Sequence, residues 1–269
     1  MSFRLRLLLD NSLSEDQKRE VRNALKAWIA FGGVGARTRR GCGALKAIGN
    51  NANEWLPPSE PEKLKAWLRQ LLPSQMTNQP AALPSLSRGH LCLIVRNFNG
   101  AIGAWRDLGS FWARFRKGHF GQEYKPMSGG KWRDYRQVLC RLRNQGNTLR
   151  LAKPYLGLPI IYQEIRGARN LCFTGNVEPA QSGRFASPVI LKPVALKNNQ
   201  IGALIVVLQA DKPTTVKIKD REYRLQPPTS DQEPLLKQLR SRDVLEAVIA
   251  AAQTHFGRGI QCLRIGGGA

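Results

Sequence analysis

Residues 30–45 read AFGGVGARTRRGCGAL. Residues 32–43 of this stretch, here called the glycine–arginine loop, contain no acidic residue. The loop's glycines and arginines are Gly32, Gly33, Gly35, Gly41, Gly43, Arg37, Arg39 and Arg40. Glycine permits positive φ and a close approach of the backbone to a ligand, and arginine adds a planar cation that pairs with phosphate. The loop is therefore a candidate for holding a polyanion.

The flanking segments predict the order strand, helix, loop, strand. Apolar and polar residues alternate over residues 3–9, which is the period of a half-buried strand. Ser14 and Gln17 have the spacing of a capping box, so we expect a helix to begin at Ser14 and to end at the C-cap glycine, Gly32. After the loop, residues 44–48 are short and strand-like.

This order excludes a nucleotide-binding phosphate loop, in which the glycines precede a helix and the helix N-terminus faces the phosphate. Here a helix ends where the glycines begin. A G-x-G-x-x-G motif counted from Gly33 would place its third glycine at Thr38, and no Gly-Lys-Ser/Thr follows.

Charge points to nucleic acid. The 269 residues contain 42 Lys and Arg against 19 Asp and Glu, a net charge of +23. An excess of this size favours a polyanionic partner, and its alternative is a charge that only keeps the protein soluble. No apolar run is long enough to span a membrane, and residues 1–10 lack the features of a signal peptide.

The five cysteines are odd in number and scattered, with no C-x-x-C pair. This pattern predicts reduced thiols in the cytoplasm and neither a disulfide framework nor a zinc site. No cluster of paired carboxylates suggests a two-metal site, so we expect no metal and no cofactor.

The rest of the chain predicts a mixture of helices and strands. We expect helices at 61–72, near 103–117, near 131–143 and over 233–256. We expect strands at 90–96, 156–162, 187–196, 201–210 and 260–265, with a turn at 197–200. The pattern of helix, glycine–arginine turn and strand thus occurs twice, over 15–48 and more weakly over 233–265.

Residues 96–153 form the most basic region, with 13 Lys and Arg against 3 Asp and Glu. Its aromatic residues could stack on bases, but Trp105, Trp112 and Phe115 have helical spacing, which is typical of a core. Besides the loop, the candidates for RNA contact are Lys125, Lys131, Arg133, Arg136 and Arg184. Arg114, Arg116 and Lys117 come next, and a solvated charge is the alternative for each.

The motif FGGVGARTRRGCGAL after an amphipathic helix resembles the signature loop of the RAMP superfamily, the RNA-binding subunits of CRISPR effector complexes. Its form is similar to that of RAMP subunit one of the type III-B (Cmr) complexes. The segments YLGLPIIY and GRFASPVILKPVAL are similar to the C-terminal half of that family.

The resemblance implies an α+β fold of two ferredoxin-like (RRM-like) RAMP domains. The first would comprise residues 1–50, a helical connector residues 51–88, and the second residues 89–269. A ferredoxin-like first domain needs a strand, a helix and a strand before residue 3, so we expect its sheet to be incomplete. We expect another chain to supply the missing strands, or the protein to be a truncated or split version.

The resemblance also implies a subunit that holds CRISPR RNA near its 3′ end, with contact to target RNA as a further option. Its expected partners are other RAMP subunits, and no membrane is expected. In this reading the glycines Gly32, Gly33, Gly35 and Gly41, together with Thr38 and the arginines, grip a sugar-phosphate backbone without reading its sequence. The alternative is a tight turn whose arginines reach water or pair with Asp16 or Glu20.

Two other functions remain open. Some RAMP relatives cut RNA without a metal, and His119 is the one histidine within a basic loop, so it could act as the general acid or base of an endoribonuclease. His90 and His255 fit structural roles. The third hypothesis is a basic linker protein whose arginines face acidic neighbouring subunits. The favoured expectation is a non-catalytic RNA-binding subunit.

Overall fold

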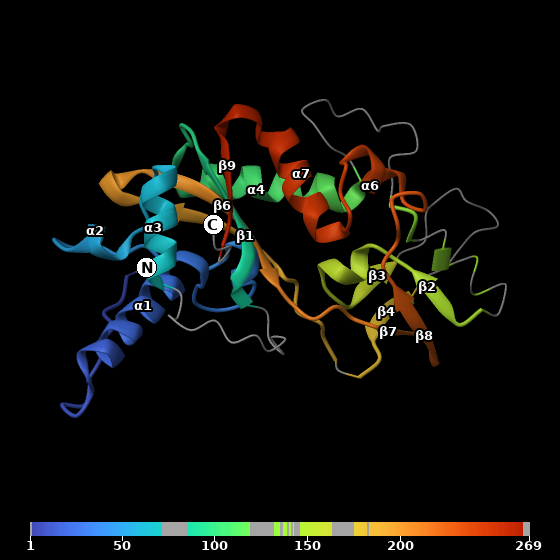
Figure 1. The fold of residues 1–269 in the computed structure, drawn as a ribbon, viewed down its shortest axis with the longest axis horizontal. Coiled ribbons are helices and arrows are strands. Elements are labelled where there is room, and N and C mark those ends of the chain that lie inside the picture. Colours follow the sequence, from blue (N-terminus) through green and yellow to red (C-terminus); the bar gives the residue numbers. More distant parts are fainter. Residues whose placement is uncertain are drawn as a thin grey trace.

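The computed structural model describes residues 2–71, 85–118, 132–134, 137, 138, 140, 142, 146–162, 175–181 and 183–265. Helices and two sheets, which are antiparallel except for one strand pair, form the molecule (Figure 1). The predicted α+β fold is confirmed.

The first sheet has the strand order β5-β6-β1-β9, and all its neighbours are antiparallel. Its strands are β1 (Ser85–Val95), β5 (Val189–Ala195), β6 (Ile201–Gln209) and β9 (Ile260–Arg264). Helix α4 (Gly100–Lys117) follows β1, and helix α7 (Val244–Phe256) precedes β9. Along the chain this sheet is built as strand, helix, strand, strand, helix, strand.

Helices cover both faces of this sheet (Figure 1). Because side chains alternate along a strand, Cys92 and Ile94 of β1 pack with α4 and α7, whereas Leu91 and Leu93 face the other way. The second face is covered by α3 (Pro61–Leu71) and by the C-terminal end of α1 (Glu15–Phe31). Burial on both sides explains the nearly continuous apolar sequences of β5 and β6.

A second sheet has the strand order β2-β8-β7-β4-β3. Its strands are β2 (Thr148–Arg150), β3 (Ile160–Tyr162), β4 (Gly175–Pro179), β7 (Thr215–Ile218) and β8 (Arg221–Gln226). Sequence analysis predicted only β3. The alternation of Val216, Ile218, Tyr223 and Leu225, all buried, was the signal for the β7–β8 hairpin.

Most predicted helices are confirmed. Helix α1 begins after Ser14, which forms the expected capping box with Gln17, and Gly32 is its C-cap. The helix expected over 233–256 is two helices, α6 (Pro234–Gln238) and α7, because the Asp243 side chain caps the N-terminus of α7 at Leu245 and Glu246. A short helix, α2 (Ala52–Trp55), precedes α3. Of the expected helix at 131–143, the described residues 134, 137, 138, 140 and 142 are helical.

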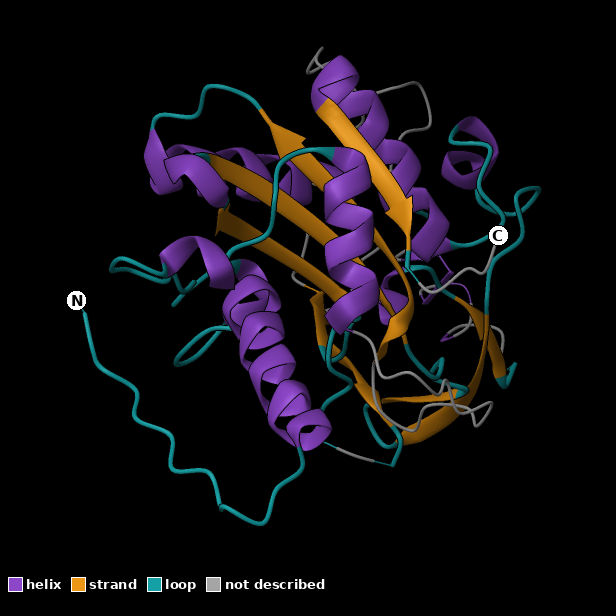
Figure 2. Cartoon of the chain, turned by 60° about the vertical axis from the view of Figure 1, so that its left-hand side comes forward, coloured by secondary structure: helices purple, strands orange, loops and turns teal. Residues whose placement is uncertain are grey.

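The two strands predicted around the loop are wrong. Residues 2–10 run as an extended loop beside no strand (Figure 2), and residues 44–48 are irregular. A strand needs a neighbour for its backbone groups, and none of the described strands pairs with either segment. Phe3, Leu5 and Leu7 consequently expose about half of their surface or more. The predicted division at residues 50 and 88 stays a prediction.

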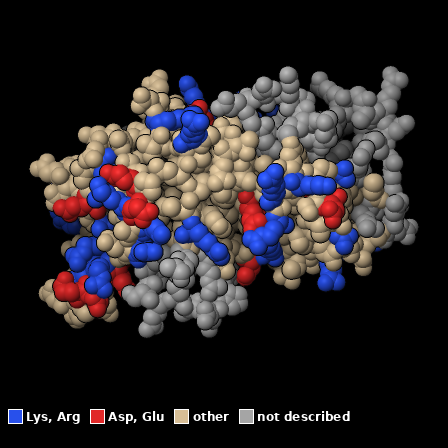
Figure 3. Space-filling model, turned by 45° about the horizontal axis from the view of Figure 1, so that its top comes forward, with Lys and Arg blue, Asp and Glu red and all other residues tan. Residues whose placement is uncertain are grey.

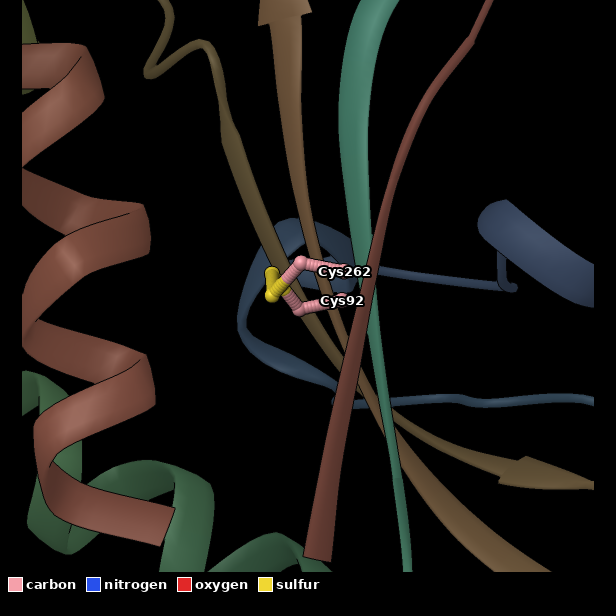
Figure 4. Close-up of a disulfide and its surroundings, with 2 residues drawn as sticks. All are labelled: Cys92 and Cys262. Atoms are coloured by element: carbon pink, nitrogen blue, oxygen red, sulfur yellow. A yellow bond between two sulfur atoms is a disulfide. The ribbon is translucent and has the colours of Figure 1, made fainter. Parts of the chain in front are cut away.

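The prediction of reduced cysteines is wrong for one pair. Cys92 and Cys262 lie opposite each other on β1 and β9 and form a disulfide (Figure 4). Their Cα atoms are 4.1 Å apart, which is within reach of a cross-strand disulfide. They are 170 residues apart in sequence, so only the folded sheet reveals the pairing. Cys42 and Cys140 are free thiols, and Cys172 lies outside the described residues.

We expect fewer reactive thiols than cysteines. Since Cys92 and Cys262 are joined, thiol titration of the denatured, unreduced protein is expected to find at most three of the five cysteines reactive. Reduction before titration is the control and should restore all five. Five thiols without reduction would show that the two strands pair without the covalent link.

None of the helices within the described ranges is both long enough and apolar enough to cross a membrane.

Candidate nucleic-acid interface

The glycine–arginine loop leaves the C-terminal end of α1 and folds back on itself. The backbone N–H of Gly32 donates to the carbonyl of Trp28 at 2.8 Å, and the indole N–H of Trp28 donates to the carbonyl of Gly33 at 3.3 Å. The N–H of Val34 donates to the carbonyl of Gly43 at 3.0 Å and so closes the loop. Between them lies the 3₁₀ turn η1 (Thr38–Arg40).

Two glycines are required by the geometry of this closure. Gly43 has φ +69°, and a Cβ atom there would overlap the carbonyl oxygen of Val34. Gly41 has φ +79°, and a Cβ atom would stand 2.8 Å from Cδ of Pro193 and 2.9 Å from Cδ1 of Trp105. The glycines therefore serve a compact turn that is pressed against β5 and α4.

Arg39 and Arg40 fasten this turn to the edge of the first sheet. Strand β5 is an edge strand of the described sheet, so none of the described strands pairs with its outward carbonyls. Arg39 donates to the carbonyl of Ser187, and Arg40 Nη1 donates to the carbonyl of Val189 at 2.7 Å. The two side chains thus satisfy the backbone of the segment that enters β5.

Arg40 is also held by α4. Its guanidinium lies 4.5 Å from the ring centroid of Trp112, and its carbonyl accepts the indole N–H of Trp105 at 2.8 Å. Burial, with the nearby charges of Arg116 and Arg39, lowers the pKa of Arg40 to about 10. Arg40 therefore remains a cation at neutral pH.

Arg37 differs from these two arginines. It lies at the start of η1 with φ 59° and ψ 29°, a left-handed conformation that is uncommon for a residue with a Cβ atom. Its side chain is exposed, and no hydrogen bond or ion pair to any described residue engages its guanidinium. Asp16, which sequence analysis considered as a partner for the loop, pairs with Arg19. Of the three arginines, Arg37 is the one whose guanidinium is held by none of the described residues.

Lys192 is a part of this site that sequence analysis missed. It lies in β5 with its side chain fully buried, and its Nζ donates to the carbonyls of Ile29 and of Gly32, the latter at 2.8 Å. The last turn of α1 contains no basic residue, and the Lys192 amine donates to the carbonyls that this helix C-terminus leaves without an intrahelical partner. Burial lowers the pKa of Lys192 to about 7. The signal was a lysine inside the apolar sequence VILKPVA.

The remaining candidate residues do not all gather at the loop. Arg133 lies far along the chain, where its backbone N–H donates to the Glu233 carboxylate at 3.0 Å and its guanidinium donates to the Gln232 carbonyl at 3.4 Å. Arg184 is exposed on the segment that leads to Ser187 and β5. Gly35 is exposed, and Thr38 is half-buried within η1. Lys125, Lys131 and Arg136 lie outside the described residues.

The aromatic residues of α4 divide into two groups. Trp112 and Phe115 are buried in the core, as their helical spacing predicted. Trp105 is 43% exposed beside the loop. Arg116 is half-buried close to Arg40 and to the buried carboxylate of Asp134, and its burial lowers its pKa.

Within the described part of the chain, the residues suited to other chemistry do not gather into a second site. His119 lies outside the described residues. His90 is part of β1, and the ring of His255 packs on Phe111 with centroids 5.5 Å apart. Among the described residues, no three His, Cys, Asp or Glu side chains form a group that could hold a metal ion.

Charge alone does not mark the loop. On the face shown in Figure 3, Lys and Arg form several separate groups, some of them beside Asp and Glu. The described residues on this face form no single continuous basic stripe. What sets the loop apart is the geometry of its glycines and arginines.

Comparisons with known proteins found a match to one family model and no individual relative. No curated protein and no solved structure was found to match the chain. The family model of the RAMP superfamily matches residues 1–46, which include α1 and the whole glycine–arginine loop, and this match supports membership of the RAMP superfamily.

Proposed function

We propose that the protein is a non-catalytic RNA-binding subunit of a type III CRISPR effector ribonucleoprotein, with the type III-B (Cmr) complexes as the closest fit. In this proposal the glycine–arginine loop holds the guide RNA near its 3′ end, next to other RAMP subunits. The RAMP match over the loop supports this function. The connectivity of the first sheet, with β9 and β1 at one side and β6 and β5 at the other, supports a ferredoxin-like second domain.

The conformation of Arg37 carries the proposal. The left-handed backbone costs an ordinary residue about 1 kcal/mol, and the surrounding structure must impose it. Arg39 and Arg40 dock the turn on β5, and this docking leaves the guanidinium of Arg37 in solvent. A planar cation on a fixed, glycine-rich turn matches the phosphate of a sugar-phosphate backbone.

Residues 2–10 support a protein partner in the same assembly. Leu8 is 90% exposed, and Phe3, Leu5, Leu7 and Leu9 are also exposed. Phe3, Leu5 and Leu7 alternate with Arg4 and Arg6 as in a strand. None of the described strands pairs with this segment, and its apolar face favours pairing with a strand of another polypeptide. We include such a strand donor among the partners.

Replacing Arg37 with glycine tests the function without damaging the fold. Glycine adopts the left-handed conformation freely, so Arg37→Gly should keep or raise the free energy of unfolding. Loss of one charge-assisted contact should weaken binding of single-stranded RNA about tenfold or more. Fluorescence anisotropy with a labelled RNA at fixed salt measures the affinity.

The matched control is Arg224→Gln, which removes the same charge from an exposed position of β8 in the second sheet. It should change the affinity much less than Arg37→Gly. Equal losses in the two variants would mean that RNA responds only to net charge, and the loop assignment would fail.

A further inference from the structure

An apolar surface of α4 lies open beside the loop. Ile102 is 64% exposed and Trp105 is 43% exposed, although the opposite side of the same helix is buried. The two residues are three positions apart and therefore neighbours on the helix surface. Exposed large apolar side chains that lie together are a mark of a binding site.

The Trp105 ring is fixed in place by the loop. Its indole N–H donates to the carbonyl of Arg40 at 2.8 Å, and its Cδ1 atom lies next to Gly41. One edge of the ring thus lies against the docked turn, while 43% of the residue's surface remains exposed. A ring held in this way loses little conformational entropy when a ligand stacks on it.

Gly109 keeps the neighbourhood of this ring open. It stands in the middle of α4, where glycine costs about 1 kcal/mol relative to alanine. A Cβ atom at Gly109 would meet no atom within 4 Å, so packing does not require glycine. A helical side chain leans toward the preceding turn, so a larger residue at position 109 would cover Trp105, four residues earlier. A ligand that approaches the ring would account for the missing side chain.

The surrounding charges specify the kind of ligand. Arg106, next to Trp105 in sequence, is exposed, and no hydrogen bond or ion pair from the described part of the chain holds its guanidinium. Arg37 is exposed on the docked loop, and Asp107 is already paired with Arg96. A flat aromatic ring among unpaired cations matches a base attached to a phosphate chain.

We propose that Trp105, with Ile102 beside it, is a stacking platform for one unpaired base of the RNA whose backbone the loop holds. This inference rests on the proposed function, because Arg37 and Trp105 would contact the same strand. Every base presents a π-face, so the platform would take any base and add affinity without sequence preference.

A comparison of two probes tests the platform. One probe is a labelled oligouridylate, and the other is an abasic oligomer of the same length. Trp105→Ala should weaken binding of the oligouridylate about fivefold to 150-fold, the range measured for loss of base stacking, and should leave the affinity for the abasic oligomer unchanged. If Trp105 serves only to position the loop through Arg40, both affinities would fall together.

Gly109 provides a second pair of variants on the exposed side of α4. Gly109→Leu should cover the ring and weaken oligouridylate binding, whereas Gly109→Ala should raise helix stability and keep the affinity. An unchanged affinity of both Trp105→Ala and Gly109→Leu for the oligouridylate would overturn the platform and assign the exposed ring to a protein contact.

The affinities for the two probes also distinguish a failure of the stacking platform from a failure of the proposed RNA-binding function. If the wild-type protein binds both probes equally and Arg37→Gly weakens both, the platform fails and the proposed function stands. If Arg37→Gly changes neither affinity, the proposed function itself fails.

Discussion

Replacing Gly43 with alanine is expected to release the glycine–arginine loop from β5. The new Cβ atom would overlap the carbonyl oxygen of Val34, and it would do so at φ +69°. Strain and overpacking together should lower the free energy of unfolding by about 2 to 5 kcal/mol. The loop cannot relax by turning a side chain, because the Val34 carbonyl is backbone and the backbone of residue 43 fixes the position of the Cβ atom.

Gly35→Ala is the matched control within the same loop. Gly35 also has positive φ, at +91°, but a Cβ atom there would meet nothing within 4 Å. In this variant the free energy of unfolding should fall only by the cost of a left-handed backbone at a residue with a Cβ atom, about 1 to 2 kcal/mol.

Chemical denaturation measures the loss of unfolding free energy in both variants. Limited trypsin digestion measures directly how accessible the loop is. Cleavage after Arg39 and Arg40, which are docked in the folded loop, should accelerate in Gly43→Ala and not in Gly35→Ala. Equal behaviour of the two variants would contradict the closure of the loop through Val34 and Gly43.

The second large effect expected is a pH dependence that comes from Lys192. Burial lowers its pKa to about 7 in the folded protein from 10.5 in an exposed lysine. Between these values the unfolded chain binds more protons than the folded protein, so stability rises with pH. The cost of burying the ammonium is fully present below pH 7 and is relieved toward pH 10.5. The neutral amine still has two N–H groups for the carbonyls of Ile29 and Gly32.

The contribution is isolated by comparison with Lys192→Met, which cannot titrate. Between pH 6 and 9.5 the free energy of unfolding of the wild-type protein should rise by about 3 kcal/mol relative to the variant. Urea denaturation at several pH values measures this difference. A constant difference would contradict a neutral Lys192, and a falling one would show that the ammonium is stabilised at the end of α1.

The sequence predicts those helix ends that are set by residues close together in the chain. The capping box of Ser14 and Gln17 and the C-cap Gly32 gave both ends of α1. Asp243 was an equally local signal for the start of α7, and the 233–256 periodicity concealed it. The strand over residues 3–9 failed for the opposite reason, because alternation specifies which side chains share a face but not whether a neighbouring strand is present.

The different roles of the loop's arginines also depend on contacts that the sequence does not reveal. In sequence, Arg37, Arg39 and Arg40 are equivalent cations on one loop. Their difference depends on carbonyls nearly 150 residues away in and before β5, with which only Arg39 and Arg40 form hydrogen bonds. The pairing of Cys92 with Cys262 was hidden in the same way, by a contact that exists only once the sheet has formed.

The salt dependence of RNA affinity tests the central claim most directly, that Arg37 contacts an RNA phosphate from a loop docked by Arg39 and Arg40. Binding constants of wild-type and Arg37→Gly protein for single-stranded RNA are measured over a range of salt concentrations. Each phosphate contact contributes about 0.7 to the slope of log affinity against log salt. If Arg37 contacts a phosphate, the slope for Arg37→Gly is about 0.7 shallower than that of the wild-type protein, and an unchanged slope would contradict the contact.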